Sequence, residues 1–137
     1  MTVSLDDKTL IDREVFARAR AELGAGFVRI LGYFREDGVK SVGAIEAAMR
    51  AQNAAAMVIP AHTLKGEALQ FGAEPLGVLA ERIEMIARDC LENHDTPDQA
   101  LSDVVALRPL FEATLAKLDR ESNPLVERRP QFGRRVG

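Results

Sequence analysis

The sequence has little cysteine, few aromatic residues and no long apolar run. Its single cysteine, Cys90, permits no internal disulfide and is compatible with a reducing compartment. Aromatic residues make up 5% of the chain, with no tryptophan, while Ala and Leu dominate, a composition that favours helices over sheets. No apolar stretch approaches the ~18 residues of a membrane-spanning helix, and no signal peptide is evident. We therefore expect a soluble, cytoplasmic protein that does not contact the membrane.

Motifs for nucleotides, metals and nucleic acids are also missing. The sequence has no dinucleotide fingerprint, no Gly-rich phosphate loop and no cluster with metal-ligand spacing. A formal net charge of −3 argues against general nucleic-acid binding. The 137 residues have room for one domain with a substantial core. We expect no cofactor and no metal on this chain, and any phosphate chemistry here would proceed without an ATP site of its own.

Apolar spacing predicts a short helix followed by four long ones. Asp12 stands where the N-cap of the short helix belongs, and the run 24–26, with two glycines, ends that helix. The second helix is predicted as one bent element that reaches about Arg50, with Gly38 as the point of a kink or break. These residues therefore mark the first two elements.

The third helix has a plausible cap at Asn53 and an awkward proline inside its pattern. Pro60 lacks an N–H and clashes with the preceding turn, so the helix either kinks there or restarts with Pro60 in its first turn. Gly72 is in the position of a C-terminal glycine. Pro75 then opens the fourth helix.

The fifth helix is predicted from about Asp98 to Arg120. Its predicted apolar face consists of Leu101, Val104, Val105, Leu110, Leu115 and Leu118. Long helices with short connections predict an all-α fold, an antiparallel up-down four-helix bundle with a short extra N-terminal helix. We assign residues 1–120 to this bundle and 121–137 to a basic, disordered tail.

One run, residues 61–73, holds the residues of chemical interest. In a helix, Ala61, Leu64, Ala68 and Phe71 share one side, and His62 points roughly opposite, toward water. Lys65 and Gly66 follow at three and four residues, so both are its neighbours on the helix surface. An exposed imidazole with a cation on one flank and no side chain on the other suits a histidine that another protein must reach.

This run resembles the signature of histidine-containing phosphotransfer (HPt) domains, the phosphocarriers of phosphorelays. In that family a histidine is followed by an apolar residue, Lys and Gly, and by a second Gly ten residues after the histidine. Here these are His62, Leu64, Lys65, Gly66 and Gly72. The resemblance implies a helical bundle and a phosphorylated His62.

The resemblance also implies roles for the neighbouring residues. Glu84, twenty-two residues after His62, would hydrogen-bond the ring nitrogen that is not phosphorylated and so fix the tautomer, with Glu81 as the alternative. Lys65 would balance the negative charge of the phosphoryl group, and Gly66 would leave room for a partner's active site. The catalytic set is thus predicted as His62, Lys65, Gly66 and Glu84.

The residues after Gly66 depart from the family, where they are usually small or polar. Leu69 falls almost on the exposed face of the histidine, where it could contact a receiver helix or narrow access. Gln70 replaces a smaller polar residue and could contact the phosphoryl group or the partner. We assign Leu69, Gln70 and Gly72 to partner binding.

The predicted function is that of a phosphorelay intermediate and not of an enzyme in its own right. His62 would accept a phosphoryl group from a sensor histidine kinase or a receiver aspartate and pass it to a response-regulator receiver domain, whose Mg²⁺ stays on the partner. We expect a monomer. The alternatives are an adaptor or inhibitor of HPt shape that binds receivers without carrying phosphate, and a structural bundle with a coincidental motif.

Overall fold

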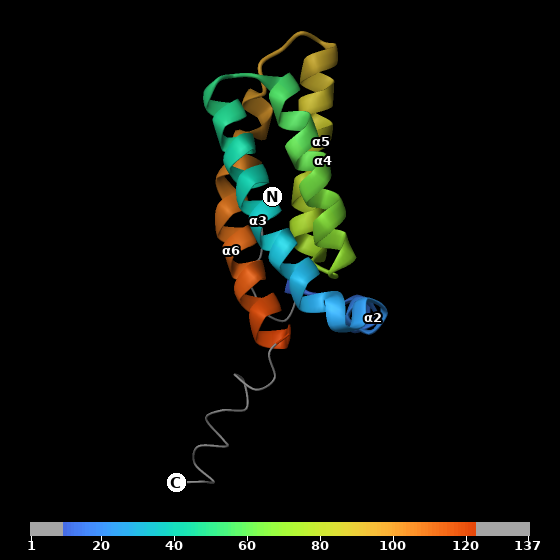
Figure 1. Ribbon diagram of the computed structural model, residues 1–137. Helices are drawn as coiled ribbons and strands as arrows, with labels where there is room; N and C mark the ends of the chain where they lie inside the picture. The colour runs from blue at the N-terminus through green and yellow to red at the C-terminus, as the bar shows by residue number, and fades with distance from the viewer. Residues whose placement is uncertain (1–9, 123–137) are drawn as a thin grey trace, which may run out of the picture.

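The computed structural model describes residues 10–122, and within them the elements are helices and the turns that join them. In chain order these are α2 (Arg13–Leu23), a 3-10 turn (Gly24–Gly26), α3 (Phe27–Arg50), α4 (Ala54–Gln70), α5 (Glu74–Glu92), a second 3-10 turn (Asp98–Ala100) and α6 (Leu101–Ser122). The helices α3 to α6 run up and down side by side, and α2 lies across one end of the bundle (Figure 1). The prediction of an all-α four-helix bundle with an extra N-terminal helix is confirmed.

Two predicted caps begin helices as expected. The Asp12 side chain accepts from the N–H groups of Glu14 and Val15 at 3.0 and 3.1 Å. The Asn53 side chain accepts from the N–H of Ala56 at 3.1 Å. Each cap satisfies donors that a helix leaves unpaired in its first turn. The sequence therefore locates the starts of α2 and α4 correctly.

Pro60 lies inside α4, so the predicted alternative of a restart at this residue is wrong. Proline leaves the carbonyl of Ala56 without its usual helical donor. The helix continues because buried apolar residues extend on both sides of Pro60 along one face: Ala54, Met57, Val58, Ala61, Leu64 and Ala68. Packing of this stripe against the core outweighs one missing hydrogen bond.

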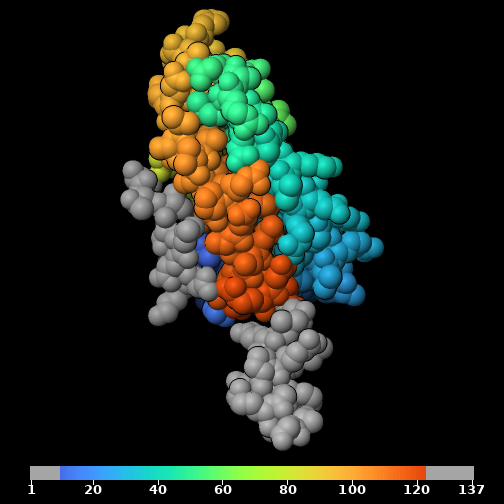
Figure 2. Space-filling view, turned by 90° about the vertical axis from the view of Figure 1, so that its left-hand side faces the viewer, coloured from blue at the N-terminus to red at the C-terminus, as the bar shows by residue number. Residues whose placement is uncertain are grey.

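Gly38 allows two helices to approach closely, and α3 continues through it as a single element. A Cβ atom on Gly38 would lie 2.4 Å from a ring carbon of Phe111, a buried residue of α6. The ring of Phe34 meets that of Phe111 edge-on, with centroids 6.0 Å apart. Helices α3 and α6 form one face of the bundle in Figure 2.

The predicted apolar face of the last helix is partly wrong. Leu101 and Val105 are exposed, and the buried positions are filled by Leu107 and Phe111 together with Val104, Leu110, Leu115 and Leu118. Leu101 and Val105 lie about 60° and 100° around the helix axis from Val104, at the margin of the core-facing stripe. Their apolar character therefore did not indicate burial.

The bundle extends slightly beyond the predicted boundary at residue 120. Glu121 belongs to α6, its carboxylate pairs with Arg13 at 3.2 Å, and its carbonyl accepts from Arg20 at 2.9 Å. These contacts join the end of α6 to α2. The predicted tail from residue 123 onward lies outside the described residues, and so does the start of the assigned domain.

Among residues 10–122, no helix combines the length and the apolar character that crossing a membrane would require.

Candidate phosphoacceptor site

The helix α4 presents His62 to solvent, with 59% of its side chain exposed. The buried stripe of Ala61, Leu64 and Ala68 holds the opposite side of the helix in the core. His62 therefore has the placement that the spacing of the motif predicted. An approaching protein can reach the ring without any unfolding of the bundle.

Glu84 lies on α5 next to His62, and only 6% of its side chain is exposed. Its Oε2 atom is 3.0 Å from Nδ1 of the imidazole. An ionised carboxylate can only accept hydrogen bonds, so this contact requires a ring proton on Nδ1, and in the neutral imidazole Nε2 then keeps a free electron pair. The structure brings together the two residues that the sequence analysis paired, whereas Glu81, the alternative, is exposed.

Two cations share the Glu84 carboxylate with His62. Lys65 Nζ lies 3.1 Å from Oε1, and Arg88 places Nε at 2.9 Å and Nη2 at 2.8 Å from Oε2. Burial by itself raises the pKa of Glu84, but the contacts with Arg88, Lys65 and His62 outweigh it, and the net pKa is lowered. Glu84 is therefore a buried carboxylate that stays ionised beside the histidine.

Gly66 leaves the surface next to His62 open. It is exposed, and a Cβ atom built on it would meet no heavy atom within 4 Å. Three residues before His62, the residue Ile59 is 70% exposed. A bare position and an apolar side chain thus flank the imidazole along one face of α4.

The predicted partner-binding residues Leu69 and Gln70 are both exposed on α4. Leu69 also packs against α5 at Gly77, where a Cβ atom would lie 2.6 Å from the Cδ2 atom of Leu69. Part of the leucine side chain therefore packs between α4 and α5 and part faces solvent.

Gly72 does not belong to this exposed surface. It is buried, with a φ of +78°, and its carbonyl accepts from the N–H of Asp12 at 2.7 Å. A Cβ atom there would lie 2.7 Å from the carbonyl oxygen of Asp12. Its position does not support a direct partner contact, because the segment that leads into α2 covers it; Gly72 ends α4 and lets α2 approach.

Sequence analysis overlooked two residues of this site, Arg88 and Ile59. The signal for Arg88 was its spacing, since Glu84 and Arg88 are four residues apart on one helix and such pairs are neighbours. Ile59 could have been recognised in the same way, one turn before His62. Neither residue belongs to the motif itself.

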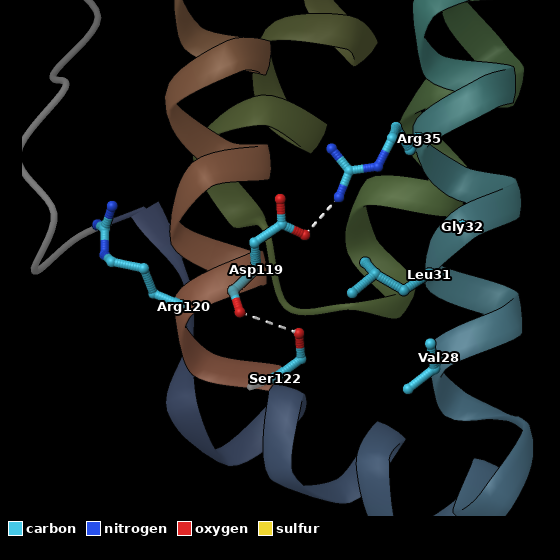
Figure 3. Close-up of a pocket in the computed structure, with 7 residues that line it drawn as sticks. All are labelled: Val28, Leu31, Gly32, Arg35, Asp119, Arg120 and Ser122. Atoms are coloured by element: carbon cyan, nitrogen blue, oxygen red, sulfur yellow. Dashed lines mark hydrogen bonds and ion pairs between the residues drawn. The ribbon is translucent and has the colours of Figure 1, made fainter. Parts of the chain in front are cut away.

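The described residues also contain a groove of about 730 Å³ between α3 and α6. It is lined by Val28, Leu31, Gly32, Arg35, Asp119, Arg120 and Ser122, with an ion pair between Arg35 and Asp119 (Figure 3). None of the predicted site residues lines this groove. The groove is therefore separate from the exposed surface around His62.

Within residues 10–122, no three His, Cys, Asp or Glu side chains are grouped so that they could hold a metal ion.

Comparison with protein families gives one match. The family model described as "Hpt domain" matches residues 29–121, which is more than half of the chain. The matched region contains α4 and α5 in full, and with them His62 and Glu84. Comparisons with curated proteins and with solved structures found no match.

Proposed function

Because the chain belongs to the Hpt domain family, whose members serve histidine phosphotransfer in two-component phosphorelays, we propose that His62 is its phosphoryl-carrying residue. The proposal rests on one observation above all, the contact of 3.0 Å between Nδ1 of His62 and the buried carboxylate of Glu84. The contact leaves Nε2 as the nucleophile and directs it away from Glu84, toward the exposed side of the ring.

The transfer step requires no proton to leave His62. Nε2 attacks the phosphorus of a receiver's aspartyl phosphate, the N–P bond forms, and the P–O bond to aspartate breaks with its electron pair on the departing carboxylate. The Nδ1 proton stays in place, so the ring becomes an imidazolium that bears the phosphoryl group. The Glu84 carboxylate then faces a positive ring, which a neutral amide at this position would stabilise less.

Lys65 provides the second charge complement. Lys65 lies one helical turn after His62, and its Nζ atom is 3.1 Å from Oε1 of Glu84. The lysine side chain is flexible and carries its charge at the end of a long stem. Its ammonium group can approach the phosphoryl oxygens after transfer. The Mg²⁺ and the acceptor aspartate belong to the receiver domain, so this chain stores the phosphoryl group and depends on its partner for the rest of the catalysis.

The surface around His62 is proposed to receive the partner. Ile59 and the exposed part of Leu69 provide apolar contact, Gln70 adds a polar group, and Gly66 leaves the approach to the ring unobstructed. We propose receiver domains and a sensor histidine kinase as partners of a monomeric cytoplasmic chain. An adaptor that binds receivers without carrying phosphate is the alternative, and the same apolar residues would serve it.

The test is transfer of label from phosphorylated receiver domains. Wild-type protein, His62→Gln and His94→Gln are each mixed with a complete set of labelled receivers, where His94 serves as control because it is an exposed histidine in the turn after α5. We expect acid-labile, base-stable label in wild type and His94→Gln and none in His62→Gln. Binding of a receiver to the wild type without any transfer would establish the adaptor instead.

A further inference from the structure

The Glu84 carboxylate has more cationic partners than the orientation of one histidine requires. Arg88 directs two N–H groups at Oε2, at 2.9 and 2.8 Å, and this is the oxygen that also lies 3.0 Å from His62 Nδ1. Lys65 makes a single contact of 3.1 Å with the other oxygen, Oε1. The two cations therefore have separate positions on the carboxylate.

The two cations also differ in how they are fixed. Arg88 and Glu84 belong to the same helix at i and i+4, with the acid on the N-terminal side, the orientation that stabilises such pairs best. Lys65 comes from α4, and its ammonium is a point charge on a flexible stem. The planar guanidinium presents a rigid fork, so Arg88 is suited to hold Glu84 permanently while Lys65 is suited to exchange partners.

We propose that Arg88 is a positioning residue that keeps Glu84 charged and oriented while Lys65 moves to the phosphoryl group. This inference rests on the proposed function of His62. Before transfer, both cations neutralise the buried carboxylate. After transfer, Lys65 can leave Oε1 for the phosphoryl oxygens only if Glu84 keeps another counter-ion, because an unpaired buried carboxylate is costly. Arg88 is that counter-ion.

A double-mutant cycle tests whether Arg88 acts through the release of Lys65. The variants are Arg88→Gln, Lys65→Gln and their combination, with Arg18→Gln as control because Arg18 is an exposed arginine on α2. Phosphoramidate serves as a donor that needs no protein partner; its P–N bond breaks, ammonia leaves, and the phosphoryl group is transferred to His62. The rate of phosphorylation and the midpoint of thermal unfolding are measured for each variant.

We expect Arg88→Gln to slow phosphorylation by about two- to fivefold, the range open to a half-exposed ion pair, with the unfolding midpoint of the control. The double variant is expected to lose more than the product of the two single losses, because Glu84 then keeps neither of its two cationic partners. A rate for Arg88→Gln equal to that of the control would overturn the proposal, and so would a double variant whose loss is the product of the two single losses.

A spectrum of the unphosphorylated protein separates this inference from the proposed function. Nitrogen-15 chemical shifts of His62 report which ring nitrogen carries the proton, and no phosphoryl donor is involved. We expect the Nδ1–H form in wild type and a gain of the Nε2–H form in Arg88→Gln. A wild type that takes no phosphoryl group contradicts the proposed function, whereas an unchanged tautomer ratio in Arg88→Gln contradicts the positioning role.

Discussion

The two glycines of the motif should respond in opposite ways to the same substitution. Gly66 is exposed in the interior of α4, and a Cβ atom there meets nothing within 4 Å. Gly72 is buried at a φ of +78°, and a Cβ atom there meets the Asp12 carbonyl oxygen at 2.7 Å and the Phe16 nitrogen at 3.1 Å. Alanine at position 66 therefore tests the surface that a partner reaches, whereas alanine at position 72 tests the backbone that positions α2.

The expected magnitudes follow from these surroundings. Gly66→Ala should raise the free energy of unfolding by about 0.5–1 kcal/mol, because alanine loses less backbone entropy in a helix interior. Gly72→Ala should lower it by about 2–4 kcal/mol, since a left-handed alanine costs about 1–2 kcal/mol and the backbone contact adds about as much again. The free energies of unfolding of the two variants should thus differ by at least ~2.5 kcal/mol.

Urea denaturation measures these free energies, and phosphotransfer from a labelled receiver measures access to His62. Gly66→Ala should transfer about tenfold more slowly or worse, because displacing reacting groups by 1 Å can cost about 100-fold. Gly72→Ala should transfer at the wild-type rate per folded molecule. A stable Gly72→Ala with slow transfer would refute this reasoning, as would a Gly66→Ala that transfers normally.

Two further predictions concern packing and pH. Gly38→Ala should lower the free energy of unfolding by about 1–3 kcal/mol, measured by urea denaturation, because its Cβ would lie 2.4 Å from the Phe111 ring. Burial and the neighbouring Asp37 raise the pKa of Glu67 to about 7. The native state therefore binds more protons than the unfolded state between pH 4.5 and pH 7, so the free energy of unfolding should fall as the pH rises. After allowance for solvent screening, we expect a fall of about 1–2 kcal/mol over this range. Glu67→Gln should abolish this fall.

Each of these predictions has a contrary result. If Gly38→Ala leaves the free energy of unfolding unchanged, α3 and α6 do not depend on this close approach. If wild type and Glu67→Gln lose stability equally between the two pH values, the pKa of Glu67 is not raised in the native state. Both experiments use the unphosphorylated protein and so are independent of the proposed function.

The parts of the fold that could be predicted from the sequence are those with local causes. Asp12 and Asn53 cap helices through side-chain bonds to residues two or three positions away. Gly72 ends α4 because it adopts a left-handed conformation. The exposure of His62 follows from the buried stripe on the other side of the same helix. In each case the decisive contact lies within a few residues of the signal.

The parts that could not be predicted depend on contacts between helices. Val105 is apolar but exposed, because the packing of the bundle decides which side of α6 faces the core. Pro60 does not end α4, because the stripe on both sides of it is buried. The near-complete burial of Glu84 is possible only with Lys65 from α4 and Arg88 beside it. The resemblance to HPt domains implied the pair of Glu84 with His62, but it indicated neither the burial of Glu84 nor the second cation beside it.

The most direct test of the central claim is the position of the phosphoryl group on the protein. A nitrogen-15 and phosphorus-31 NMR spectrum of protein phosphorylated by its receiver identifies the phosphorylated residue and the ring nitrogen bonded to phosphorus. The Nδ1 contact with Glu84 predicts phosphorus on Nε2 of His62, with the proton retained on Nδ1. Phosphorus on Nδ1, on His94 or on no histidine would contradict the account.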